Sequence, residues 1–172
     1  SLDPILYDSI LILGGDGTIN EILNGILSRT DGYLPTFCFL PGGTGNSVLH
    51  DLEYLDPLVA LQPLINYHIR YIDVMVLQFK SFIEYSINIL GWGLVADIAI
   101  LAEKLRFIGQ SRYDLASLYY ILKLKKQEGI LVLDNTKYHD KYLFILIQNT
   151  VHTGKGMKAA PNAKLDDGLI DI

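Results

Sequence analysis

The stretch that most restricts the fold of this chain is residues 9–21, which read SILILGGDGTINE. An apolar run that stops at two glycines is typical of a buried parallel strand. Asp16 then lies between glycines, and a helical pattern begins at once. In open α/β folds this is the carboxyl end of a strand beside the positive end of a helix, where anions bind. We therefore expect a phosphate-binding turn with Asp16 beside it; the alternative is an aspartate that only caps backbone amides.

The composition indicates one globular protein of one or two domains. The chain has 172 residues and a net charge of −5, which provides no electrostatic footprint for nucleic acid. Half of the residues are hydrophobic, yet no apolar run approaches the ~18 residues that a membrane span needs. The start of the sequence does not have the pattern of a secretory signal, so we expect an intracellular protein. The single cysteine, Cys38, lies in an apolar run and is expected to be a buried, unreactive thiol.

The first part of the chain has the pattern of an α/β domain. Thr18 and Glu21 have the spacing of a capping box, which predicts a helix that starts there and fades between residues 28 and 32. A second short strand is expected over 36–40, and a helix over 58–67 that Asp56 and Pro57 open. The pattern changes to strands over 70–79 and 81–90. The predicted domains are therefore residues 1–69 and residues 70–172.

The second part of the chain mixes helices with strands. We expect one helix after residues 91–93 that Gly109 breaks, and another over 113–126. Strands are expected over 129–133 and 142–148, followed by a polar loop over 149–164 and a turn into a strand over 165–172. The second domain is thus predicted to be β-rich with inserted helices.

A second glycine-rich turn supports the first. Residues 41–47, PGGTGNS, follow directly on the strand predicted over 36–40. Because the carboxyl ends of neighbouring parallel strands meet at one edge of a sheet, the amides of both turns can converge on one polyphosphate. The Thr44 hydroxyl would add a donor. Neither a Walker loop nor the Rossmann glycine spacing is present.

The paired turns resemble the catalytic domain shared by diacylglycerol, sphingosine and ceramide kinases. The resemblance continues through residues 91–97 (GWGLVAD), 103–113 (EKLRFIGQSRY) and 160–171 (APNAKLDDGLID), and the second of these blocks is most similar to the sphingosine and ceramide kinases. It implies an open parallel-sheet nucleotide-binding domain, like that of NAD kinases and phosphofructokinases, followed by a β-sandwich-like domain. Both domains are expected to be incomplete in these 172 residues.

The resemblance also implies the chemistry and the residues that perform it. The expected reaction transfers the γ-phosphate of ATP, with Mg²⁺, to a lipid hydroxyl, and Asp16 matches the carboxylate that takes the hydroxyl proton. Glu21 matches a nucleotide-site position, although a capping role is an equal alternative. Arg106 and Arg112 match phosphate-contacting arginines, whereas on residue spacing alone they are typical of a solvated surface. The full set of nucleotide-site positions is Gly14, Gly15, Gly17, Thr18, Glu21, Gly43, Thr44, Gly45, Arg106 and Arg112; no metal ligand is assigned.

The lipid is expected to be a sphingoid base, with ceramide or diacylglycerol as alternatives. Sphingosine kinases resemble residues 92–97 but carry a second acidic residue where this chain has Ala99, so a cationic amine would depend on Asp97 or another group. Asp97 has a helix cap as its alternative role, and Leu94 is a candidate for an acyl-chain pocket or for plain core. Transient, peripheral contact with a membrane from the cytoplasm is expected because the substrate resides there.

Two other classes of function remain open. NAD kinases and phosphofructokinases carry similar Gly-Gly-Asp-Gly turns but do not resemble residues 41–47, Arg106 or Arg112. A lipid-binding module without catalysis would have no need of Asp16. Family members also carry a nucleotide-gripping loop before Gly14 and an Asp-Gly-Glu turn after the last strand, neither of which occurs here. We therefore expect weak or no kinase activity from these 172 residues alone.

Overall fold

The computed structural model describes residues 6–154 and 156–172, without the side chains of Arg106 and Gln110. The described residues fall into two compact units. The first extends up to Ile89 and includes Gln148–Asp171, and the second comprises Leu90–Ile147 together with Ile172. The domain boundary expected near residue 70 stays a prediction.

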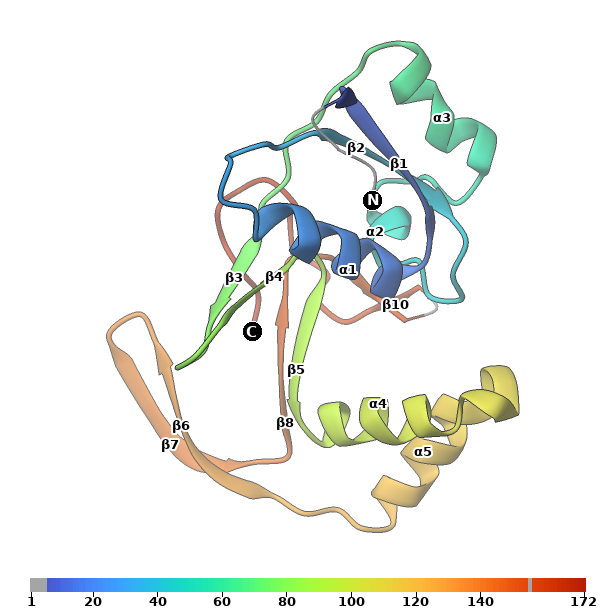
Figure 1. Ribbon diagram of the computed structural model, residues 1–172. Helices are drawn as coiled ribbons and strands as arrows, with labels where there is room; N and C mark the ends of the chain where they lie inside the picture. Colours follow the sequence, from blue (N-terminus) through green and yellow to red (C-terminus); the bar gives the residue numbers. More distant parts are fainter. Residues whose placement is uncertain (1–5, 155) are drawn as a thin grey trace. The chain divides into compact units, whose positions relative to one another are not determined.

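The centre of the first unit is a parallel pair of strands, as the sequence predicts. β1 (Ser9–Gly14) pairs in parallel with β2 (Thr36–Pro41), and the helix α1 (Asp16–Leu27) connects them (Figure 1). The register places Gly14 opposite Pro41, so both strands end at the same level. The two glycine-rich turns therefore start side by side.

One face of this strand pair carries the core of the unit. Ile12 and Phe39 pack with Ile19 and Leu23, which lie on the apolar stripe of α1 that the helical spacing predicts. Cys38 points to the opposite face, because side chains alternate along a strand, and its Sγ lies 3.7 Å from the Ala60 carbonyl oxygen of α3 (Pro57–Ile65). Cys38 is 9% exposed, which agrees with the expectation of a buried thiol.

The expectation that β1 is a buried strand holds for one of its faces and is wrong for the other, among the described residues. Leu11 and Leu13 are 51% and 69% exposed, although both belong to the apolar run. They share the Cys38 face, since Leu11 is paired with Cys38, and α3 contacts β2 instead. β1 is covered by the core on the Ile12 face and left open on the Leu11 face, which explains why burial alternates along the strand.

Short elements complete the first unit. They are the helix α2 (Ser47–Asp51), the hairpin of β3 (Met75–Gln78) and β4 (Ile83–Ser86), and the two-residue strands β9 (His152–Thr153) and β10 (Met157–Lys158). The hairpin turns near Lys80, as expected, but residues 70–74 are not in a strand. Asn24 of α1 exchanges two hydrogen bonds with the backbone of Tyr85, Nδ2 to O at 2.8 Å and N to Oδ1 at 2.8 Å, and so docks α1 on β4.

The second unit combines two helices with two strand pairs. Its elements are β5 (Ile89–Gly93), α4 (Leu94–Lys104), the 3-10 helix η2 (Arg106–Ser111), α5 (Arg112–Ile121), β6 (Gln127–Leu133), β7 (Thr136–Tyr142) and β8 (Phe144–Gln148). β6 pairs with β7 in an antiparallel hairpin, and β5 pairs with β8. Gly109 has a φ of +76° and interrupts the helical path, as expected.

Two predictions for the second unit are wrong. α5 ends at Ile121 instead of Lys126, because residues 122–125 alternate between leucine and lysine and lose the helical period. β7 is missing from the prediction, since its sequence TKYHDKY has few apolar residues to mark a strand. Among the described residues, no helix combines the length and the apolar character that a membrane crossing requires.

Candidate active site

The two glycine-rich turns touch through their backbones. The Gly42 amide donates to the Gly14 carbonyl oxygen at 3.0 Å, and a Cβ built on Gly43 would lie only 2.4 Å from the Gly15 Cα. A side chain at Gly43 or at Gly15 would therefore displace the opposite turn. The two turns therefore meet, and the convergence of their amides on one polyphosphate stays a prediction.

Asn46 closes the second turn. It adopts a left-handed conformation with a φ of +50°, its Oδ1 accepts from the Gly43 amide at 3.0 Å, and its Nδ2 donates to the Gly43 carbonyl at 2.9 Å. The Gly43 amide is therefore occupied within the chain. In the part of the chain that the structure describes, the amides of Thr44 and Gly45 donate to no protein acceptor, so this turn offers two amides to an anion.

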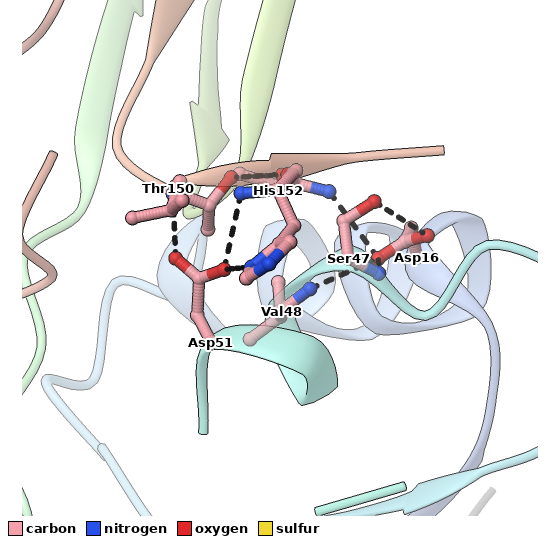
Figure 2. Close-up of polar contacts among 8 residues, drawn as sticks. Asp16, Ser47, Val48, Asp51, Thr150 and His152 are labelled. Carbon is pink, nitrogen blue, oxygen red and sulfur yellow. Dashed lines mark hydrogen bonds and ion pairs between the residues drawn. The ribbon is translucent and has the colours of Figure 1, made fainter. Parts of the chain in front are cut away.

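Asp16 is the first residue of α1, but its carboxylate caps a different helix. Asp16 Oδ1 accepts from the amides of Ser47 at 2.8 Å and Val48 at 3.4 Å, both at the start of α2 (Figure 2). It also accepts from Nδ2 of Asn88 at 3.2 Å. Among the residues that the structure describes, the partner of Asp16 Oδ2 is the Ser47 hydroxyl, at 3.5 Å. Asp16 therefore does cap backbone amides through Oδ1, as the alternative interpretation expected, and Oδ2 remains available to accept a proton.

Oδ2 faces the second glycine-rich turn. A Cβ built on Gly45 would lie 2.9 Å from Asp16 Oδ2, so glycine at this position leaves the oxygen open. Asp16 Oδ2, with its long contact to the Ser47 hydroxyl, and the amides of Thr44 and Gly45 therefore belong to the same small region. This arrangement suits a base that acts next to a bound phosphate.

A second carboxylate, Asp51, lies at the other end of α2 and is 6% exposed through its side chain. It accepts from the amides of Val151 at 2.6 Å and His152 at 3.1 Å, and its Oδ1 lies 2.5 Å from His152 Nδ1 (Figure 2). The His152 ring lies against the His50 ring, with 5.3 Å between centroids. Sequence reasoning missed this pair because the two residues are 101 positions apart.

Asn88 and Thr150 were also missed. The Thr150 hydroxyl donates to Asn88 Oδ1 at 2.5 Å, and Thr150 is fully buried. The sequence does contain a signal for them, because the polar residues Gln148, Asn149 and Thr150 end an apolar strand. Buried polar groups need hydrogen-bond partners, so such a tripeptide indicates a polar network.

The capping box predicted for Thr18 and Glu21 is wrong. α1 begins at Asp16 with Gly15 as its N-cap, and no side chain caps it. The Thr18 side chain instead covers Gly14, where a Cβ would lie 2.7 Å from the Thr18 Cβ. Glu21, Thr18 and Gly17 are exposed on α1. Their roles in a nucleotide site stay predictions.

The remaining candidate residues belong to the second unit. Arg112 begins α5, where its NH1 lies 3.6 Å from Glu103 Oε2 and its guanidinium stacks on the Tyr113 ring. Arg106 lies in η2, and its side chain is outside the described part of the structure. Leu94, Asp97 and Ala99 lie on α4, whose N-cap is Gly93 without a side-chain bond, so Asp97 is not a helix cap. Each unit is described by itself, and the convergence of these residues with Asp16 stays a prediction.

The donor set fits a metal ion that arrives with phosphate. Among the described residues, no group of three or more histidine, cysteine or acidic side chains gathers to hold a metal by itself. Mg²⁺ at phosphate sites needs only one or two carboxylates, because substrate phosphates and water complete its shell. Asp16 Oδ2 is compatible with this role, but the same oxygen cannot bind the ion and accept a proton at the same time, and the proposal below assigns it the proton.

Two family models match the chain. The diacylglycerol kinase catalytic domain matches residues 2–77, and the YegS C-terminal NAD kinase beta sandwich-like domain matches residues 88–172. The resemblance and the fold class expected from the sequence are therefore confirmed.

Curated relatives agree with these models. Sphingosine kinase 1 from Arabidopsis thaliana is 33% identical over 100% of this chain and 45% of its own length. Sphingosine kinase 2 from the same plant is 35% identical over 75% of this chain and 28% of its length. Diacylglycerol kinase from Bacillus subtilis is 31% identical over 96% of this chain and 54% of its length. The chain thus spans about half, or less, of the length of these relatives.

The fold has close counterparts among solved structures. The crystal structure of a diacylglycerol kinase from Bacillus anthracis matches with a TM-score of 0.67 at 24% identity, over 95% of this chain and 52% of that one, which concerns the fold alone. Another structure from that organism matches with a TM-score of 0.73 at 27% identity, over 95% and 54%. Together, the two matched domains and these relatives show that the chain belongs to the lipid kinase family that includes the diacylglycerol and sphingosine kinases.

Proposed function

We propose that the protein is an ATP-dependent lipid kinase that phosphorylates a hydroxyl of a sphingoid base. The observation that carries the proposal is the unequal use of the Asp16 carboxylate. Oδ1 is held by three nitrogen donors, whereas Oδ2 faces Gly45 in the turn that has free amides. A fixed base beside a phosphate-binding turn is what phosphoryl transfer to an alcohol needs.

In the proposed reaction, Asp16 Oδ2 accepts the proton of the lipid hydroxyl. The hydroxyl oxygen forms a bond to the γ-phosphorus while the bond from that phosphorus to the bridging oxygen breaks, and ADP leaves. ATP with Mg²⁺ supplies the phosphoryl group and neutralises its charge. The amides of Thr44 and Gly45 hold phosphate oxygens, and Arg106 and Arg112 are proposed to add charge. Arg112 would have to exchange its contact with Glu103 for the phosphate.

Support for the sphingoid base comes from the relatives and from Asp97. Two of the similar curated proteins are sphingosine kinases, and a diacylglycerol kinase is similar at nearly the same identity. Asp97 is half-buried in the first turn of α4 and is proposed to contact the lipid head group, next to the exposed Ala99 and near Leu94. Ceramide and diacylglycerol are the alternatives because Ala99 provides no second carboxylate. The enzyme is proposed to act from the cytoplasm at a membrane surface.

A phosphorylation assay with a panel of acceptors tests the proposal. The full-length protein is incubated with γ-labelled ATP and Mg²⁺ and with sphingosine, ceramide or diacylglycerol in mixed micelles, or with NAD as a soluble acceptor. Labelled sphingosine phosphate is the expected product. Labelled ceramide or diacylglycerol would show that the substrate is that lipid and not a sphingoid base. Labelled NAD would refute the proposal that the protein is a lipid kinase. Binding of lipid micelles without any labelled product would indicate a non-catalytic module.

A further inference from the structure

We propose that Asn88 and Thr150 are positioning residues for Asp16, in that they fix the orientation of its carboxylate so that one oxygen points at the phosphate-binding turn. This inference rests on the function proposed above and extends it to two residues outside the glycine-rich turns. Neither residue is assigned a contact with the substrate. They act through the Asp16 carboxylate.

Chemistry determines the orientation of the Asn88 side chain. The Asp16 carboxylate only accepts hydrogen bonds, so the Asn88 atom that faces Oδ1 at 3.2 Å must be the amide nitrogen. The amide oxygen of Asn88 then points away and needs a donor. The Thr150 hydroxyl, 2.5 Å away, is that donor; its second acceptor, the His152 carbonyl oxygen, is more distant at 3.1 Å. Rotation of the amide by 180° would place oxygen against the carboxylate and nitrogen against the hydroxyl, and the first contact would be repulsive.

Thr150 is held firmly enough to impose this orientation. On one side, the Asn149 amide donates to the Asn88 carbonyl at 2.9 Å, and Asn149 Nδ2 donates to the Asp73 carbonyl at 3.0 Å. On the other side, Asp51 accepts from the amides of Val151 and His152. Asn149 and Thr150 are 1% and 0% exposed, so water does not compete for these bonds.

Hydrogen bonds and two short stretches of backbone together form a closed circuit. Starting from Asp16, the circuit passes through Asn88 and Thr150 to the backbone of residues 151–152, and then to Asp51. Asp51 is the last residue of α2, and the first residues of α2 donate their amides back to Asp16 (Figure 2). Asp16 Oδ1 is therefore held by α2 on one side and by Asn88 on the other, and Oδ2 points toward Gly45.

The position of the circuit connects it to catalysis. A displacement of a reacting group by about 1 Å can lower a rate about 100-fold, because catalysis depends on near-attack geometry. Loss of the Asn88 amide donor or of the Thr150 hydroxyl frees the carboxylate to rotate. The turnover number should fall, while the binding of ATP and of the lipid should change little.

The test compares variants of the full-length protein. Thr150→Val keeps the shape of the side chain and removes the hydroxyl, Thr150→Ser keeps the hydroxyl, and Asn88→Ala removes the amide. Thr36→Val, at the far end of β2, is the matched control for a threonine-to-valine change. We expect kcat to fall 10- to 100-fold for Thr150→Val and Asn88→Ala, with KM for ATP and lipid within twofold, and Thr150→Ser and Thr36→Val to stay within threefold of wild type.

A second measurement is independent of activity. The side-chain amide signals of Asn88 in a ¹H–¹⁵N spectrum report its bonds, and we expect them to shift in Thr150→Val but not in Thr36→Val. Folded Thr150→Val and Asn88→Ala proteins with wild-type kcat would overturn the proposal, as would equal losses in Thr150→Val and Thr150→Ser or unchanged Asn88 signals. If Thr150→Val does not fold, the kcat values of Asn88→Ala and Thr150→Ser test the proposal: a loss in the first and near wild-type turnover in the second would support it, and any other result would overturn it. An inactive wild-type protein would refute the proposed function instead, and the Asn88 signals would still test the circuit.

Discussion

Gly15 and Gly43 pack Cα against Cα, so that a Cβ added to Gly43 would lie 2.4 Å from the Gly15 Cα. This contact joins the two glycine-rich turns at the ends of β1 and β2. It explains in steric terms why both turns carry glycine at the point where they meet. The contact brings the second turn, with the amides of Thr44 and Gly45, next to the residues that lead into Asp16.

Gly43→Ala should destabilise the first unit and weaken nucleotide binding. The added methyl group must push the two turns apart, and overpacking of this kind costs about 1–3 kcal/mol. Gly25→Ala in α1 is the control, since nothing lies within 4 Å of a Cβ there. It should stabilise the protein by about 0.5–1 kcal/mol, because alanine favours a helix over glycine. Urea unfolding and ATP titration of both variants measure the difference, and equal stabilities would contradict the contact.

Gly45→Ala should act on catalysis more than on folding. Its Cβ would lie 2.9 Å from Asp16 Oδ2, the oxygen proposed to accept the proton, and 3.5 Å from the Gly154 carbonyl oxygen. A methyl group there blocks the base or turns it, so we expect a loss of kcat of about 10- to 100-fold. Thermal unfolding should show that the variant is folded. Wild-type turnover in this variant would mean that Oδ2 is not the reacting oxygen.

Asn24→Ala should destabilise the first unit by about 1–3 kcal/mol, because the Tyr85 amide and carbonyl lose their partners when the side chain is removed. Asn20→Ala, one turn earlier on the exposed side of α1, is the control and should change stability by less than about 0.5 kcal/mol. Urea denaturation of both variants measures this. Similar midpoints would show that Asn24 does not dock α1 on β4.

Cys38 should react slowly with iodoacetamide in the folded protein. Burial raises the pKa of the Cys38 thiol, so less of the reactive thiolate is present at any pH below that value. Unfolding in urea should restore the ordinary pKa and increase the alkylation rate, which mass spectrometry follows over time. Equal rates in the folded and the unfolded protein would contradict the burial of this residue.

The fold was predictable where short-range patterns dominate. β1, α1, β2 and α3 follow from apolar runs, helical spacing and an Asp-Pro helix start, and Asp56 does cap α3 by accepting from the Leu58 amide at 2.7 Å. β7 and the end of α5 were not predictable in this way. β7 has a weak apolar pattern and is stabilised as a strand by its pairing with β6. A prediction from the residues of β7 alone does not take that pairing into account.

The site was predictable in its turns but not in its polar circuit. The sequence places Asp16 and Gly43 at the ends of adjacent strands, and their meeting follows from strand order alone. Asn88 reaches Asp16 from 72 positions away, and Asp51 reaches His152 from 101 positions away. Such contacts depend on how loops return to the sheet, which no local pattern encodes. The capping-box prediction failed for a related reason, since Gly15 precedes α1 and Thr18 covers Gly14 instead.

The turnover of Asp16→Asn tests the central claim most directly. Asparagine keeps an oxygen for the amides of Ser47 and Val48, so the local fold should survive, but its nitrogen replaces the oxygen that faces Gly45. Removal of a general base lowers a rate by about 10²–10⁴-fold. We predict a loss of lipid phosphorylation in that range, with unchanged thermal unfolding and ATP binding. A folded Asp16→Asn protein that phosphorylates its lipid at the wild-type rate would contradict the account.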